Sequence, residues 1–426
     1  MLRTSGINLA ALVCIQAANA IIPLMIVPLV LTRLGAGAYV ELAVAEAASM
    51  LVLALVLFSF EVDGVARVAG LSPVQDGPAL SEALSDLVSA RIILFAIGGF
   101  SAIAIGFWVD GHFPVLLALY LLVPLGQVFH CYWFYQGIVR NLTPAIATVT
   151  ARALSLVLVL VLVHEADDQH WVPLLIGLPF LGAGIASLAY TQSVFGFRVR
   201  WAGFPRVWWT VCHGREIFVG NAAVTLYREM NVVLLSIVGA PSAGIAAYSL
   251  IEKTVKMIQA CTRPLSQFFF PKVIRGIAGY GTPSPMAARQ VARFTLYQVV
   301  IMILILLAIP IAYLLLAPRW PWLAGFAAMP GVVAMFAVMA PATVFGLANF
   351  MFGSAALNYL GARRYLLFAI LGTGIASAAM CLALGARIGA MGGAICFLFS
   401  ETFLFALILG RFLFGRHGHG STGVVA

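Results

Sequence analysis

Residues Ser249 to Lys272 read SLIEKTVKMIQACTRPLSQFFFPK, and this stretch constrains the fold of the whole chain. It lies inside a long apolar region, yet it contains charged and amide side chains at helical spacing. At about 100° per residue in an α-helix, several of them share one face, with Lys253 at its edge. The residues on this face are Glu252, Lys256, Gln259, Arg263, Ser266 and Gln267. Because a charge at the centre of a bilayer costs about 2.5–3.5 kcal/mol even on a lenient scale, we expect this face to line protein or a water-filled cavity.

The composition around this stretch is that of a membrane protein. The chain of 426 residues is 63% hydrophobic and 9% charged, whereas about a quarter of the residues in a globular domain are charged. Its net charge of +9 is spread thinly between apolar segments. There is no basic face with interleaved aromatic residues, so we expect no nucleic-acid partner. The six cysteines stand singly, and they predict neither a metal site nor a disulfide framework.

Apolar runs long enough to cross about 30 Å of hydrocarbon predict twelve transmembrane helices in an all-α polytopic membrane protein. The runs cover residues 7–31, 39–60, 88–108, 113–136, 142–163, 171–193, 216–238, 244–270, 291–316, 322–350, 363–384 and 388–410. The first run resembles a signal peptide, with an A-x-A pattern at Ala18 to Ala20. It continues unbroken to Leu31, too far for a signal peptide, so we expect it to remain as the first span.

The distribution of Lys and Arg predicts the orientation of the chain. With the N-terminus in the cytoplasm, fifteen basic residues fall in the inner segments. Only three, Arg33, Arg319 and Arg387, fall in the outer loops. The outer loop HEADDQH at residues 164–170 is acidic, which fits the same orientation. We therefore predict that both termini are cytoplasmic.

The chain is predicted to divide into two halves. Residues 194–215 form a polar segment that we interpret as a cytoplasmic linker between an N-terminal lobe, 1–193, and a C-terminal lobe with a short cytoplasmic tail, 216–426. A weak repeat supports this division. Asn19 to Glu46 reads NAIIPLMIVPLVLTRLGAGAYVELAVAE, and Asn231 to Glu252 reads NVVLLSIVGAPSAGIAAYSLIE. Parallel repeats of this kind place the substrate path of a transporter at their interface.

Intramembrane charges make the interface of the two halves a candidate binding site. On the helices predicted over 216–238 and 244–270, four cations face two carboxylates. The cations are Arg228, Lys253, Lys256 and Arg263, and the carboxylates are Glu229 and Glu252. This excess favours a cationic cavity for an anionic substrate over a set of purely structural ion pairs. Gln259 shares the polar face, and Arg152 of the helix predicted over 142–163 could add to the cavity.

Three carboxylates are candidates to bind a coupling proton or sodium ion, namely Glu46, Glu229 and Glu252. Each also has a structural interpretation. Glu46 could pair with Arg91 or Arg152, while the other two could pair with lysines of the helix that contains Lys253 and Lys256. In particular, Glu252 and Lys256 have the i,i+4 spacing of a helical ion pair.

Other polar residues in the predicted spans have mainly structural interpretations. We expect Arg91 to extend toward the inner headgroups and Glu401 to form a structural pair. Asn8, Gln16 and Asn19 share one face of the first span. They could line the cavity or form interhelical hydrogen bonds.

No catalytic constellation is recognisable in the sequence. There is no G-x-S-x-G motif, phosphate-binding loop, metal-ligand spacing or paired-carboxylate site in a soluble domain. We therefore predict that the protein is not an enzyme and needs no cofactor beyond a coupling proton or sodium ion.

Three segments carry a family resemblance. They are NAIIPLMIVPLVLTRLGAGAYVELAVAE, YWFYQGIVRNLTPAIATVTARALSLVLVLVLVHEADD (Tyr132 to Asp168) and NVVLLSIVGAPSAGIAAYSLIEKTVKMIQACTRPLSQFFFPKVIR (Asn231 to Arg275). Together they resemble the polysaccharide-repeat-unit flippases, of the Wzx or O-antigen type, in the MATE-like multidrug/oligosaccharidyl-lipid/polysaccharide exporter superfamily. The resemblance covers roughly residues 1–275 and is mostly topological beyond them.

The resemblance implies two six-helix lobes around a central cationic cavity, in a multi-pass protein of the bacterial inner membrane. It implies alternating access that moves an oligosaccharide linked to undecaprenyl diphosphate from the inner to the outer leaflet. This function would serve the synthesis of O-antigen, capsule or exopolysaccharide, with membrane lipids and the polysaccharide polymerase and chain-length machinery as further partners. The alternative is a MATE-type drug or metabolite antiporter, and a non-transporting membrane scaffold or enzyme is the least expected.

Overall fold

The computed structural model describes residues 2–414 except 70, 74, 109–112, 320–328 and 330. Within these ranges the regular secondary structure is helical and no strand occurs. The all-α prediction is confirmed. The predicted tail from residue 415 onward and the beginning of the span predicted over 322–350 lie outside the described residues.

The first half of the chain forms a series of membrane-length and shorter helices. They are α1 (Leu2–Leu57), α2 (Phe60–Val68), α3 (Gly77–Gly106), α4 (Phe113–Tyr120), α5 (Leu122–Phe129), α6 (Tyr132–Gly137), α7 (Leu142–Leu162), η1 (Ala166–His170) and α8 (Trp171–Phe195). The second half continues with α9 (Phe204–Ile237), α10 (Ser242–Ile277), α11 (Pro285–Leu316), α13 (Val332–Asn349), the π-helix η2 (Phe350–Leu357), α14 (Arg363–Ile388) and α15 (Ala390–Phe414).

These helices account for twelve membrane crossings. In the described residues, nine helical segments are long and apolar enough to span a bilayer, and α1 counts once among them. However, α1 contains two helices that meet at a kink at Gly35, where φ is 81°. Helices α9 and α10 have 34 and 36 residues, so they are also long enough to span, and they contain the intramembrane charges. The predicted count of twelve therefore agrees with the described helices.

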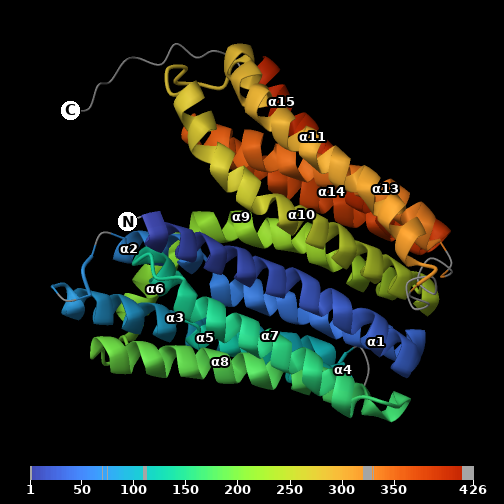
Figure 1. Cartoon of the computed structure of the whole chain (residues 1–426), viewed down its shortest axis with the longest axis horizontal. Coiled ribbons are helices and arrows are strands. Elements are labelled where there is room, and N and C mark those ends of the chain that lie inside the picture. The colour runs from blue at the N-terminus through green and yellow to red at the C-terminus, as the bar shows by residue number, and fades with distance from the viewer. Residues whose placement is uncertain are drawn as a thin grey trace.

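Successive crossings alternate between two ends of the molecule, as Figure 1 shows. One end, which we call the basic end, contains the start of α1 and the end of α15. It also contains the last turns of α2 and α10, with Arg67 and Arg275, and the connections that carry Arg140 and Arg198. The other end, which we call the opposite end, contains the kink at Gly35. The segregation of arginines that the sequence predicts thus corresponds to one face of the structure.

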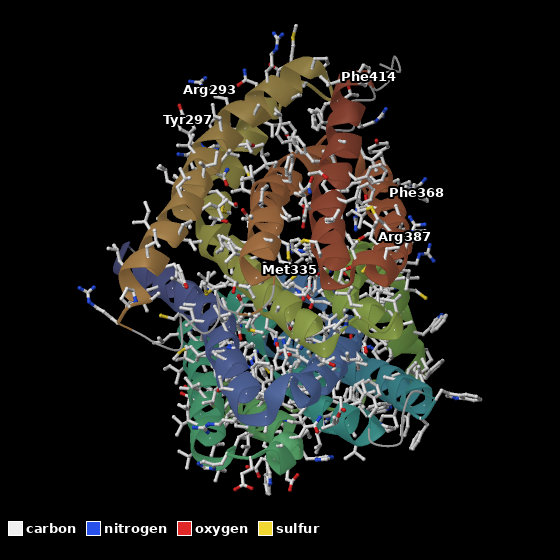
Figure 2. The ribbon with its side chains drawn as sticks, turned by 90° about the vertical axis from the view of Figure 1, so that its right-hand side faces the viewer. Arg293, Tyr297, Met335, Phe368, Arg387 and Phe414 are labelled. Carbon is white, nitrogen blue, oxygen red and sulfur yellow. The ribbon has the colours of Figure 1, made fainter. Side chains whose placement is uncertain are left out.

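Helices α1 to α8 form one helical body, and α11 to α15 form a second, with α9 and α10 between them (Figure 1). The two bodies lie close together at the opposite end and diverge toward the basic end. Figure 2 shows the second body above the first, with Met335 of α13 near their junction and Arg293 and Tyr297 on the outward side of α11.

The hydrophobic core follows the same division. At the opposite end a single buried cluster joins both bodies, with Val30 and Leu42 of α1, Val255 of α10 and Met339 of α13 among its members. Toward the basic end the core separates into two clusters. One contains Leu84, Trp133, Phe197 and Val207, and the other contains Ile277, Leu357, Leu366 and Phe412. Continuous packing closes the opposite end, while at the basic end each body has a core of its own.

The turn of the predicted repeat recurs in the structure. Gly35 has a φ of 81° and Gly239 has a φ of 70°, a conformation that L side chains rarely adopt. Each glycine precedes a helix whose first turns contain a tyrosine, Tyr39 or Tyr248. Both sequence stretches therefore change direction at a glycine of positive φ, Gly35 inside α1 and Gly239 between α9 and α10.

Helices α5 and α8 pack through glycine. A Cβ atom on Gly184 of α8 would overlap the backbone carbonyl of Gly126 in α5, whereas a Cβ atom on Gly182, also in α8, would meet nothing within 4 Å. Small residues allow this backbone approach in membrane helices.

We expect Gly184→Val to lower the free energy of unfolding by about 1–3 kcal/mol, because it overpacks this contact. Gly182→Val is the matched control and should change it by less than about 0.5 kcal/mol. Thermal unfolding of the detergent-purified variants measures both, and equal stability of the two would contradict the packing described here.

Candidate functional site

A cavity of about 350 Å³ lies between the first body and helices α9 and α10. It is lined by α1, α7, α9 and α10, together with residues of α4, α5 and α8. Its charged lining residues are Glu46, Arg152, Glu229, Glu252, Lys253, Lys256 and Arg263, and its amide lining residues are Gln16 and Asn19. The cavity thus collects seven of the nine residues that the sequence predicts for substrate or ion binding, with Arg228 and Gln259 outside its described lining.

The two lysines of the cavity are paired with carboxylates. Lys253 Nζ lies 2.5 Å from Glu46 Oε2, which belongs to α1. Lys256 Nζ lies 2.8 Å from Glu229 Oε2 and 3.4 Å from Glu252 Oε1. The predicted contacts of Lys256 are confirmed. Of the two interpretations of Glu46, pairing with Arg91 or Arg152 is wrong, because α10 packs against α1 and brings Lys253 to Glu46. Ion binding by Glu46 stays a prediction.

Glu252 is the most enclosed of the cavity carboxylates, with 4% of the residue exposed. Besides Lys256, it accepts a hydrogen bond of 3.4 Å from the Tyr248 hydroxyl. That hydroxyl in turn accepts one of 3.0 Å from Asn231 Nδ2. The asparagine of α9 and the tyrosine of α10, both part of the predicted repeat, therefore hold the glutamate in place.

Arg228 and Gln259 form a separate polar cluster behind the cavity. Arg228 lies 3.5 Å from Glu401 Oε1 of α15 and donates to the Gln259 side-chain oxygen. Asn349 Nδ2 donates to Glu401 Oε2 over 2.8 Å and to the Glu401 carbonyl over 2.9 Å. Glu401 is buried, and the structural pairing predicted for it is confirmed.

Arg152 and Arg263 are held by amides of α1 instead of carboxylates. Arg152 Nε donates to Asn19 Oδ1 over 3.0 Å, and its guanidinium lies 5.0 Å from the centre of the Phe180 ring. Arg263 donates to Gln16 Oε1 over 3.3 Å. Among the residues that the structure describes, neither arginine has a carboxylate within ion-pair distance.

The spacing on α1 brings these two arginines to one place. Gln16 and Asn19 are three residues apart, so they are neighbours on the helix surface, with about 5–6 Å between Cβ atoms. Arg152 approaches them from α7 of the first body, and Arg263 approaches from α10, which leads into the second. Arg152 of α7 and Arg263 of α10 thus hydrogen-bond to neighbouring amide side chains of α1.

The charge of the cavity is smaller than the sequence suggests. Two lysines and two arginines face three carboxylates in its lining, which leaves one net positive charge. All three carboxylates pair with lysines, whereas the described residues place no carboxylate within ion-pair distance of either arginine. Glu46 acts on Arg152 only from beyond that distance. The polar face of the first span is the signal in the sequence that points to this location. Asn8, by contrast, binds the backbone at Val139 and Asn141.

Arg91 is not at the membrane surface, as the sequence analysis expected. It is fully buried and lies 3.1 Å from Glu61 Oε1. It also donates to the carbonyl oxygens of Gln127 and His130, at 3.1 Å each. The break between α5 and α6 exposes carbonyl groups that need donors, so Arg91 stabilises a helix end instead of extending to the headgroups.

We compared the chain with protein families, curated proteins and solved structures. No family model matches the chain. A Shigella dysenteriae protein named "Putative O-antigen transporter" is 21% identical over 302 residues, which cover 69% of this chain and 73% of that protein. An Escherichia coli (strain K12) protein of the same name is 17% identical over 268 residues, which cover 62% of this chain and 64% of that protein.

Solved structures with the same fold are MATE transporters. An inward-facing multidrug resistance MATE family transporter of the MOP superfamily has a TM-score of 0.67 at 14% identity, over 93% of both chains. A MATE transporter of Vibrio cholerae has a TM-score of 0.52 at 15% identity, over 97% of both chains. The chain has the MATE fold, and the family resemblance predicted from its sequence is confirmed.

We expect Glu46→Gln to lower the free energy of unfolding by about 1–3 kcal/mol, because it leaves the half-buried Lys253 ammonium without its counter-charge. The exchange of Glu46→Lys with Lys253→Glu should restore most of this loss.

Glu41→Gln is the matched control, because Glu41 is an exposed glutamate of the same helix. It should change the stability by less than about 0.5 kcal/mol. Thermal unfolding in detergent measures the stability of all three variants. An unchanged stability of Glu46→Gln would show that the ion pair does not stabilise the packing at the opposite end.

Proposed function

We propose that this multi-pass membrane protein with the MATE fold is a flippase for oligosaccharides linked to undecaprenyl diphosphate. The observation that carries the proposal is that Arg152 and Arg263 are held by neutral amides in a cavity between the first helical body and helices α9 and α10. A polyprenyl diphosphate needs such a site, because its charged group must cross the bilayer while its tail stays in lipid.

The chemistry of the arginine pair suits a diphosphate. A guanidinium group is always charged and presents a planar fork of donors that matches phosphate oxygens. The guanidiniums of Arg152 and Arg263, which donate to neighbouring amides of α1, would offer one fork to each phosphoryl group. In the structure the side-chain oxygens of Asn19 and Gln16 occupy these donors, so an entering phosphate would replace a neutral acceptor and not a competing anion.

The lysines of the cavity have a different role in the proposed cycle. Lys253 and Glu46 join α10 to α1, and Tyr39 and Ser249 join the same helices through a buried hydrogen bond of 2.8 Å. Both contacts must break before the opposite end can open. A diphosphate near Lys253 competes with Glu46 for the ammonium group, so substrate binding would weaken the closed end, as differential binding requires.

Coupling to an ion follows the same logic. Glu46, Glu229 and Glu252 each lie within 3.4 Å of a lysine in this conformation. Binding of a proton or a sodium ion to one of these carboxylates would release its lysine toward the substrate. We propose these three residues as the coupling sites and the substrate-facing lysines, Lys253 and Lys256, as secondary contacts for the diphosphate.

The orientation follows from the positive-inside rule. With the basic end in the cytoplasm, both termini are cytoplasmic and the helical bodies diverge toward the inner leaflet. The site would then receive its lipid-linked substrate where such lipids are assembled. The O-antigen transporter names of the two curated relatives support this cargo.

A drug or metabolite antiporter is the second candidate, favoured by the three carboxylates in the cavity and by the multidrug transporter of the same fold. A cationic drug would bind to these carboxylates, whereas the arginine pair repels it. A susceptibility panel on a deletion strain separates the two candidates, since broad drug sensitivity with normal surface polymer would favour the antiporter.

We expect the double variant Arg152→Gln/Arg263→Gln to lose surface polysaccharide and to accumulate diphosphate-linked oligosaccharide in the inner membrane. A hydrogen bond to a charged group contributes about 1.5–3 kcal/mol, so each single variant should weaken diphosphate binding by about 10- to 100-fold. Lipid extraction and mass spectrometry of a complemented deletion strain measure the accumulation.

The matched control is Arg319→Gln/Arg387→Gln, which removes two arginines at the opposite end, away from the cavity. It should restore polymer like the wild type. Normal polymer and normal lipid intermediates in the Arg152/Arg263 double variant would refute the assignment of the diphosphate site.

A further inference from the structure

We propose that the surface around residues 196–209 at the basic end is a binding site for the headgroup of an anionic phospholipid. A groove of about 620 Å³ lies there, between the start of α3 and the connection from α8 to α9. Its lining includes Ser81, Ser85, Arg198, Arg200 and Trp201. The groove is separate from the central cavity, and no step of the proposed transport cycle uses it.

A ladder of serines makes the wall of this groove rigid. Ser81, Ser85 and Ser89 stand four residues apart on α3, so their hydroxyls lie on one face of the helix. They accept hydrogen bonds from the backbone N–H groups of residues 198, 200 and 202 at 3.3, 3.1 and 3.0 Å. Every second N–H of this extended segment is thus tied to α3, which fixes the side chains that it presents.

The side chains of the segment differ in exposure. Phe197 and Ala202 are buried against the first body, whereas Arg198, Arg200 and Trp201 are exposed. An extended segment places alternate side chains on opposite faces. The alternation holds from Phe197 to Arg200, and Trp201 and Ala202 depart from it. The two arginines are therefore held toward the surface without the entropy cost of ordering a flexible loop.

The acidic residues of the groove already have partners. Asp86 lies 3.2 Å from Arg206 Nε and 3.9 Å from Arg67, and Glu82 pairs with Arg206. In the part of the chain that the structure describes, no carboxylate lies within ion-pair distance of Arg198 or Arg200. These two arginines give the surface a positive charge that calls for an external anion.

The aromatic residues beside the arginines identify the kind of anion. Trp201, Phe204, Trp208 and Trp209 are each 58–67% exposed, and they follow one another at the start of α9. Phe204 and Trp208 stack on one another with ring centres 6.4 Å apart. Exposed tryptophans next to arginines at the end of membrane helices mark the depth of the lipid headgroups. An anion at this depth, with acyl chains beside the rings, is a phospholipid.

The experiment is native mass spectrometry of the full-length protein titrated with phosphatidylglycerol or with phosphatidylcholine of the same acyl chains. We expect the wild type to prefer the anionic lipid. Arg198→Gln/Arg200→Gln should reduce this preference on the order of tenfold. Each arginine near an anionic lipid surface raises the binding affinity by roughly fivefold. The charge-conserving variant Arg198→Lys/Arg200→Lys should retain most of it.

Arg289→Gln/Arg293→Gln is the matched control, because it removes two exposed arginines of α11 at the basic end, outside the groove. It should keep the wild-type preference. The proposal is overturned if the wild type binds both lipids equally. It is also overturned if Arg289→Gln/Arg293→Gln reduces the preference for the anionic lipid as much as Arg198→Gln/Arg200→Gln does. The thermal midpoint of each variant, measured in parallel, shows that the protein analysed is folded.

Discussion

The cost of an uncompensated charge inside a membrane is the constraint on which this structure depends. Helices α9 and α10 contain charges that lipid would reject, and the fold satisfies them by turning both helices toward the interface of two helical bodies. There Lys253 meets Glu46 and Lys256 meets Glu229. The position of the cavity is therefore a consequence of where these charges can be paired or hydrated.

The same pairs join the helices at the opposite end, whereas the two bodies diverge toward the basic end. The ion pair between Lys253 and Glu46, the hydrogen bond between Tyr39 and Ser249 and a shared apolar core all join α1 to α10. Toward the basic end each body has a core of its own. Alternating access needs such a division, because the bodies can rock only where their contacts are few and exchangeable.

The proposed binding site differs from structural pairing in two arginines that, in the described residues, have no carboxylate within ion-pair distance. Arg91 is buried with Glu61 and helix carbonyls, and Arg228 with Glu401 and Gln259, so these cations stabilise the lobes. Arg152 and Arg263 face the cavity with amide oxygens of α1 as their hydrogen-bond acceptors. A neutral acceptor holds an arginine in position and can be replaced by phosphate at small cost, which makes such arginines suited to a reversible anion site.

The sequence by itself determined the class, the twelve crossings, the segregation of arginines and the polar face of α10, because these depend on local hydropathy and helical period. It also determined the pairing of Glu252 with Lys256, which lie within one helix. Only the tertiary structure decided that Glu46 faces Lys253 and that Arg152 and Arg263 meet Asn19 and Gln16 on α1. Those contacts join residues more than 100 positions apart, and helical periodicity places a charge on a face without saying which helix will lie against it.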